Sequence, residues 1–108
     1  MNHNVIELNK SNFAHKVLSA SEPVLVQFWA GSSASSKAAA PMLESVAEEV
    51  ALPVKIGRVN VEQQQQLAED YGVRCVPTVL IFNQGGLRDE IVGRTTEEEV
   101  RQKLQRFK

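Results

Sequence analysis

The chain has one cysteine, Cys75, among its 108 residues. One cysteine cannot form an intramolecular disulfide, so nothing in the composition requires an oxidising compartment. No apolar run approaches the roughly 18–20 residues needed to span a bilayer. The first four residues also lack the charged-then-apolar pattern of a signal peptide. We therefore expect a cytoplasmic protein without a membrane partner.

An excess of charge of either sign is also missing. The 12 basic and 13 acidic residues leave a formal net charge of −1, which argues against a nucleic-acid partner held by phosphate neutralisation. Hydrophobic residues make up 43% and charged residues 23% of the chain, the balance of an ordinary globular protein. The length fits one domain over residues 1–108. The sequence predicts no metal ion and no cofactor.

Hydrophobic patterning predicts an α/β protein with the element order βαβαβαββα. The expected strands lie at residues 5–8, 24–30, 54–61, 76–82 and 87–92. The stretch 24–30 is largely apolar, as strands covered on both faces are, and the last two strands form a hairpin around 83–86. These strands predict a central sheet with parallel and antiparallel pairs.

Four helices are expected between and after these strands. Ser11 is a plausible cap for the first helix, and either Thr95 or Thr96 for the last. A long helix is predicted over 34–50, and a shorter one over 62–71 that Gly72 ends in the left-handed conformation.

Three segments resemble the thioredoxin family, in the same order along the chain. The first reads Phe28-Trp29-Ala30-Gly31-Ser32-Ser33-Ala34-Ser35-Ser36-Lys37, with Pro41 four residues on. The second reads Tyr71-Gly72-Val73-Arg74-Cys75-Val76-Pro77-Thr78-Val79-Leu80-Ile81-Phe82. The third is Gly85-Gly86, a short strand and Gly93. The resemblance covers nearly the whole chain and implies the thioredoxin fold, a central mixed sheet flanked by helices on both faces.

The residues that perform thioredoxin chemistry differ from those of the family. Ser33 and Ser36 occupy the two positions of its Cys-x-x-Cys motif, and disulfide exchange requires a thiolate that a serine cannot supply at neutral pH. Gln27 matches a buried aspartate that moves protons for the second cysteine. Ser32 matches an aromatic residue. Because all these positions have changed, the resemblance predicts a protein that has lost the redox reaction.

Other roles for the serine segment receive less support from the residues. Ser33, or another serine of the run, is expected to cap the long helix. A serine nucleophile would need a base and an oxyanion hole, but the two histidines, His3 and His15, both precede the second strand. Arg58 matches a lysine of many thioredoxins, and we expect it to be a surface charge at a strand edge.

The resemblance also implies a peptide-binding groove that needs no cysteine, although Pro77 could equally have a purely architectural role. The resemblance implies that Pro77 is a cis-proline and that the backbone of Val76 pairs with a bound peptide as an added strand. The groove is formed by Trp29, Ser32, Ser33, Ala34, Ser35, Val76, Pro77 and Gly93. The leading prediction is a redox-inactive module that binds a protein or peptide partner in this groove.

Two other functions remain open. Cys75 is either a small buried hydrophobe or a single thiol at the groove rim that forms a mixed disulfide. A thiol-disulfide oxidoreductase would result if Cys75 acts with an external thiol, or if Ser33 and Ser36 replace native cysteines. The third function is a structural subunit that uses the same surface within a larger assembly.

Overall fold

The computed structural model describes residues 5–50 and 53–107. Its elements are β1 (Val5–Glu7), the short π-helix η1 (Ala14–Leu18), β2 (Val24–Trp29), α1 (Ala34–Glu49), β3 (Lys55–Asn60), α2 (Gln65–Asp70), β4 (Thr78–Asn83), β5 (Gly86–Val92), α3 (Glu97–Leu104) and the 3₁₀ turn η2 (Gln105–Phe107). This order confirms the βαβαβαββα arrangement expected from the sequence. The expectations that depended on residues 1–4, His3 included, lie outside the described residues.

The five strands form one mixed sheet in the order β1-β3-β2-β4-β5. The strands β1, β3 and β2 run parallel, whereas β4 is antiparallel to both β2 and β5. β2 lies in the middle of the sheet and has five fully buried residues, 24–28. This agrees with its apolar sequence, which is typical of a strand covered on both faces.

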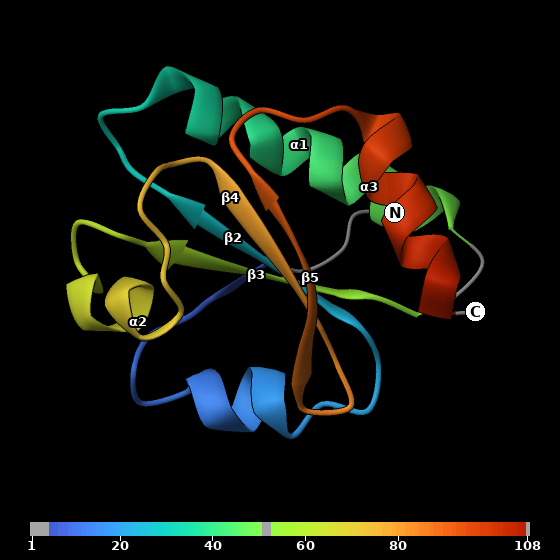
Figure 1. The fold of residues 1–108 in the computed structure, drawn as a ribbon, viewed down its shortest axis with the longest axis horizontal. Helices are drawn as coiled ribbons and strands as arrows, with labels where there is room; N and C mark the ends of the chain where they lie inside the picture. The colour runs from blue at the N-terminus through green and yellow to red at the C-terminus, as the bar shows by residue number, and fades with distance from the viewer. Residues whose placement is uncertain (1–4, 51–52, 108) are drawn as a thin grey trace.

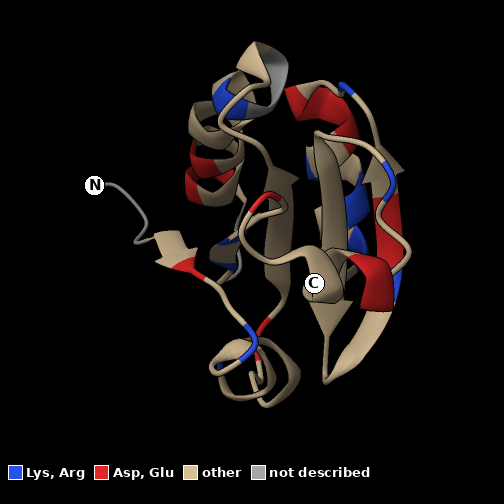
Figure 2. Ribbon diagram, turned by 90° about the vertical axis from the view of Figure 1, so that its left-hand side faces the viewer, with Lys and Arg blue, Asp and Glu red and all other residues tan. Residues whose placement is uncertain are grey.

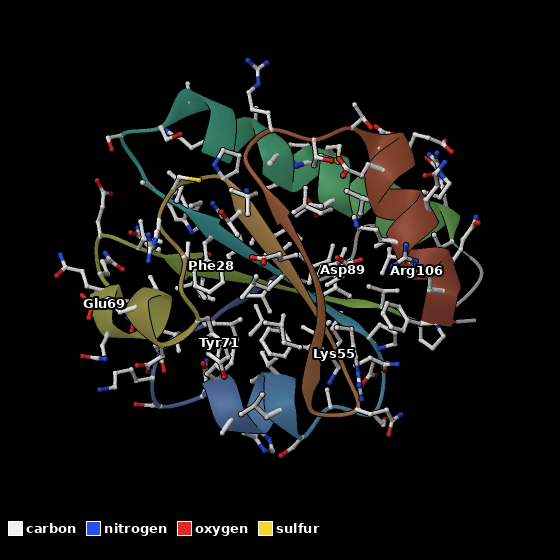
Figure 3. The ribbon with its side chains drawn as sticks, viewed as in Figure 1. Phe28, Lys55, Glu69, Tyr71, Asp89 and Arg106 are labelled. Atoms are coloured by element: carbon white, nitrogen blue, oxygen red, sulfur yellow. The ribbon has the colours of Figure 1, made fainter. Side chains whose placement is uncertain are left out.

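Helices cover both faces of the sheet (Figure 1). α1 and α3 pack on one face, where they bury Leu43, Val46, Val100 and Leu104 against the sheet. The other face holds η1 and α2, and its core includes Phe13, Val17, Leu67, Phe28 and Phe82. Tyr71 lies beside this second core (Figure 3), with its ring centroid 5.5 Å from that of Phe82.

The predicted helix starts were less accurate than the predicted order. α2 begins at Gln65, three residues later than expected, because Asn60 organises a turn before it. The carbonyl of Asn60 accepts the N–H groups of Gln63 and Gln64, and its side chain accepts the N–H of Glu62. Gly72 then follows α2 with φ of +69°, in the left-handed conformation expected there.

The capping prediction was wrong at the first helix and correct at the last. Ser11 does not cap η1; its own N–H donates to the side chain of Asn9 at 2.8 Å, within a turn that precedes the helix. At α3, Thr96 is the N-cap and accepts the N–H of Glu99 at 3.2 Å. The Thr95 hydroxyl bonds the Glu99 carboxylate instead.

Residues of both charge signs occur on the same elements. Figure 2 shows Lys and Arg alongside Asp and Glu on several elements, which agrees with the net charge of −1. Among the helices of the described residues, none is long and apolar enough to cross a membrane.

Candidate functional site

The serine segment forms the junction between β2 and α1. The N–H of Ser33 donates to the carbonyl of Ala30 at 3.1 Å, and the Ser33 carbonyl accepts the N–H of Lys37 at 3.2 Å. Ser33 therefore stands directly before α1 and accepts its first intrahelical bond, which is the N-cap position. Ala34 is exposed, whereas the side chains of Ser35 and Ser36 lie outside the described part of the structure.

Glu62 holds this junction from the neighbouring strand. Its carboxylate accepts the backbone N–H of Gly31 at 3.0 Å through one oxygen and the hydroxyl of Ser32 at 3.1 Å through the other. Sequence reasoning missed this residue. The available signal was its position just after β3, because the neighbouring parallel strands β2 and β3 end together, with Trp29 opposite Asn60.

Arg58 covers the Trp29 ring instead of lying at a strand edge. β3 runs between β1 and β2, so the prediction of an edge position was wrong. The guanidinium carbon of Arg58 lies 4.1 Å from the Trp29 ring centroid, in the range of a cation–π contact. Its Nη1 also lies 3.5 Å from Glu7. One face of Trp29 is therefore occupied within the protein.

Val76 and Pro77 precede β4 at the same end of the sheet. Phe28 pairs with Thr78, so Trp29, the last residue of β2, and Pro77, just before β4, lie at the ends of neighbouring strands. The Val76–Pro77 peptide bond is cis. Within residues 5–50 and 53–107, no hydrogen bond uses the N–H or the carbonyl of Val76.

Gly93 approaches Pro77 from the end of β5. Its N–H donates to the Pro77 carbonyl at 2.8 Å, and its φ is +84°, a conformation that favours glycine. The first turns of α1 also reach this place, because Ala38 and Ala39 line a hollow together with Pro77 and Gly93. The structure thus brings the helix start, Pro77 and Gly93 to one end of the sheet.

Gln27 and His15 supply no base for Ser33. Gln27 is fully buried in β2, opposite Arg58 and Val79, so a neutral amide occupies the position to which the sequence resemblance assigns a proton-relay aspartate. His15 is exposed on η1, which packs on the face of the sheet opposite α1. Among the described residues, no group of three His, Cys, Asp or Glu is arranged to hold a metal ion.

Cys75 is exposed, so its interpretation as a small buried hydrophobe was wrong. It lies in the loop before β4, where the Thr78 hydroxyl donates to the Cys75 carbonyl at 2.8 Å. The thiol borders a shallow hollow of about 160 Å³ that Val61, Val73 and Val76 also line. The single thiol is therefore accessible, and it lies next to Val76 in the chain.

Comparisons with known proteins agree with this geometry. A sequence model of the family described as Thioredoxin matches residues 4–106. Thioredoxin C-2 of Corynebacterium nephridii is 38% identical over 107 residues, which cover 99% of this chain and 95% of that protein. Thioredoxin 1 of a Nostoc species is 32% identical, with coverage of 93% and 94%.

A longer relative and a solved structure are also similar to this chain. Chloroplastic thioredoxin M4 of Arabidopsis thaliana is 34% identical over 95% of this chain, which spans about half of that relative, 53% of its length. A mutant thioredoxin from Halobacterium salinarum superposes with a TM-score of 0.86 at 26% identity, covering 96% of this chain and 90% of that one. From its sequence match and its fold, the chain belongs to the thioredoxin family.

Proposed function

We propose that this protein is a redox-inactive thioredoxin-like module that binds an extended segment of a partner protein. The segment pairs with the backbone of Val76 in the groove beside Pro77 and Gly93. Trp29, Ser32, Ser33, Ala34 and Ser35 form the opposite side of this groove. Residues 1–108 act as one domain in this proposal.

The unpaired backbone of Val76 is the observation that carries the proposal. An exposed N–H and carbonyl beside a sheet form the template on which an extended peptide adds as a strand. Val76 is half-buried, and its N–H and carbonyl have no hydrogen-bond partner among the described residues. Binding of this kind requires no thiol.

The chemistry of the neighbouring residues supports the redox-inactive part. Ser33 offers a hydroxyl, and disulfide exchange proceeds through a thiolate. Gln27 cannot accept or release a proton at neutral pH. Without a carboxylate at this fully buried position, the desolvation cost of a buried charge is also absent.

The proposal is tested with peptides selected from a random display library on the immobilised protein, under reducing conditions. Selected peptides are then titrated into the ¹⁵N-labelled protein. We expect the largest amide shifts at Val76 and Gly93, and the same affinity for the Cys75→Ser variant. Shifts confined to the outer edge of β5, or affinity that disappears in Cys75→Ser, would contradict the proposal.

The exposed thiol supports one alternative, in which Cys75 forms a mixed disulfide with a partner thiol or a small thiol. The observation in its favour is the accessible position of Cys75 next to Val76. This chain holds no second cysteine to resolve such a disulfide, so an external thiol would have to release the adduct. Partner capture that requires oxidising conditions and vanishes in Cys75→Ser would establish this alternative.

A further inference from the structure

A second hollow lies beside the Val76–Pro77 groove, between α1 and the connection from β5 to α3. Its volume is about 190 Å³. Ala38, Ala39 and Met42 line it from α1, and Pro77 and Val79 line it from the sheet. Figure 1 shows the β5–α3 connection passing beside the first turns of α1.

We infer that this hollow receives one leucine-sized aliphatic side chain of the bound partner segment, next to a carboxylate that faces Arg94. The inference rests on the proposed function, because it names what the partner presents beside the groove. It adds a preferred partner sequence, an aliphatic residue adjacent to an acidic one.

The size and walls of the hollow fit an aliphatic occupant. An apolar protein cavity of about 150 Å³ binds benzene, so about 190 Å³ accommodates a leucine side chain. The helix wall ends at the Cβ atoms of Ala38 and Ala39, which leaves this space open. Met42 is half-buried, and its flexible thioether adapts to different shapes.

Two polar groups of the lining, the Thr95 hydroxyl and the Gly93 N–H, already have partners. The Thr95 hydroxyl donates to the Glu99 carboxylate, and the Gly93 N–H donates to the Pro77 carbonyl. A polar occupant would lose its bonds to water without gaining bonds from these groups, which is unfavourable. An aliphatic side chain loses nothing and buries apolar surface, which is favourable.

One cation sets the charge at the opening of the hollow. Arg94 lines the hollow and is exposed. It belongs to no ion pair of the described residues. A free cation at the edge of an apolar hollow attracts a carboxylate next to the buried side chain.

The inference is tested by titrating the ¹⁵N-labelled protein with N-acetyl-leucine, N-acetyl-leucinamide and N-acetyl-alanine. We expect saturable shifts at the Ala39 and Thr95 amides, with N-acetyl-leucine binding at least roughly tenfold tighter than N-acetyl-alanine because its side chain buries more apolar surface. The carboxylate should add about two- to fivefold over the amide. This preference should disappear in Arg94→Gln.

Two variants of α1 test the location. Ala39→Leu fills the hollow and should weaken N-acetyl-leucine binding by roughly tenfold or more. The matched control, Glu48→Leu, adds the same side chain at an exposed position of α1 and should leave binding unchanged. Equal affinity for Ala39→Leu and Glu48→Leu would overturn the inference, as would equal binding of the leucine and alanine probes.

The outcomes separate this inference from the proposed function. Suppose that library peptides shift the Val76 amide signal but tens of millimolar N-acetyl-leucine leaves the Ala39 and Thr95 amide signals unshifted. This result would overturn the inference about the hollow and leave the proposed function standing. N-acetyl-leucine shifts at the hollow support the inference even if the library yields no peptide that shifts Val76, a result that would contradict only the proposed function.

Discussion

At the residue scale, Arg58 and Glu62 contact Trp29, Gly31 and Ser32 at the β2–α1 junction. The sequence of the junction does not reveal these contacts. Arg58 occupies one face of Trp29, so the tryptophan offers a partner only its remaining surface. Glu62 fixes Gly31 and Ser32 by two hydrogen bonds. Bonds to an ionised acceptor are stronger than neutral ones, so the loop before α1 is held in one arrangement before any partner binds.

The Glu62 contact predicts the behaviour of one amide. Glu62→Ala should leave the Gly31 N–H without its acceptor and cost about 1 kcal/mol locally, which corresponds to roughly fivefold faster hydrogen exchange at Gly31. Gln63→Ala, at the exposed neighbouring position, is the control. Unchanged exchange at Gly31 in Glu62→Ala would show that the contact does not order the loop.

The site was predicted from the sequence only where a residue type carries its own signal. Ser33, Pro77 and Gly93 stand in motifs, and the structure brings the helix start, Pro77 and Gly93 together. The roles of Glu62 and Arg58 depend on which strands become neighbours, and no local pattern contains that information. The exposure of Cys75 likewise depends on the loop before β4 and not on the preference of cysteine for interiors.

At the scale of elements, the close approach of β1 and β3 depends on Gly57. A Cβ atom built at Gly57 would lie 2.4 Å from Cδ1 of Leu8, a buried residue of the second core. Gly57→Ala should therefore destabilise the protein by about 1–3 kcal/mol through overpacking, measured by chemical denaturation.

Two further variants check the cause of that loss. Gly31→Ala is the matched control, because its Cβ would meet only the Glu62 carboxylate at 3.5 Å. In Gly57→Ala/Leu8→Ala, the loss should be smaller than the sum of the two single losses, since removing the Leu8 side chain relieves the clash. Strict additivity would contradict the steric explanation.

At the same scale, ion pairs join β5 to α3 and η2. Asp89 lies 3.0 Å from Nζ of Lys103 and 3.3 Å from Nη1 of Arg106, and Figure 3 shows Asp89 on the side of β5 that faces Arg106. Burial by itself would raise the pKa of Asp89. The hydrogen bonds from Lys103 and the Glu90 N–H, with the charges of Lys103 and Arg106, outweigh burial and lower this pKa.

A lowered pKa in the folded state implies a pH-dependent contribution to stability. The contribution is complete above the unfolded-state pKa of about 3.9 and is lost as the pH falls through the folded-state pKa. Asp89→Asn should therefore destabilise the protein by about 1 kcal/mol at pH 7, and this difference should begin to shrink below pH ~3.9 and disappear below the folded-state pKa.

Urea denaturation across this pH range checks the prediction, with the exposed Glu90→Gln as control. A difference between Asp89→Asn and the parent that stays constant from neutral to acid pH would contradict the role of the ionised carboxylate.

The elements themselves were predictable because their signals are local. Apolar periodicity located β2 and α1 to within a residue or so, and Gly72 ended α2 as its conformational freedom suggests. The start of α2 was misplaced because the Asn60 side chain and carbonyl take the first N–H groups into a turn. Likewise, the Asn9 side chain takes the Ser11 N–H into a turn, so Ser11 does not cap η1.

At the scale of the whole molecule, the sheet topology gathers the site at one end. The parallel strands β2 and β3 finish there, and the antiparallel β4 begins there. Loops at the carboxyl ends of parallel strands are a common place for ligand sites in α/β folds. The Ser33 junction, Glu62, Pro77 and Gly93 therefore converge whether or not a thiol is present, so the proposed binding does not depend on a cysteine at Ser33 or Ser36.

The most direct test of a thiol-independent function is the reduction of insulin by dithiothreitol, followed by turbidity. The parent chain and Cys75→Ser are compared with buffer alone, and an active thioredoxin serves as the positive control. We expect both chains to match the buffer rate, because Ser33 supplies no thiolate. Turnover by the parent that disappears in Cys75→Ser would make Cys75 a nucleophile and contradict the redox-inactive account.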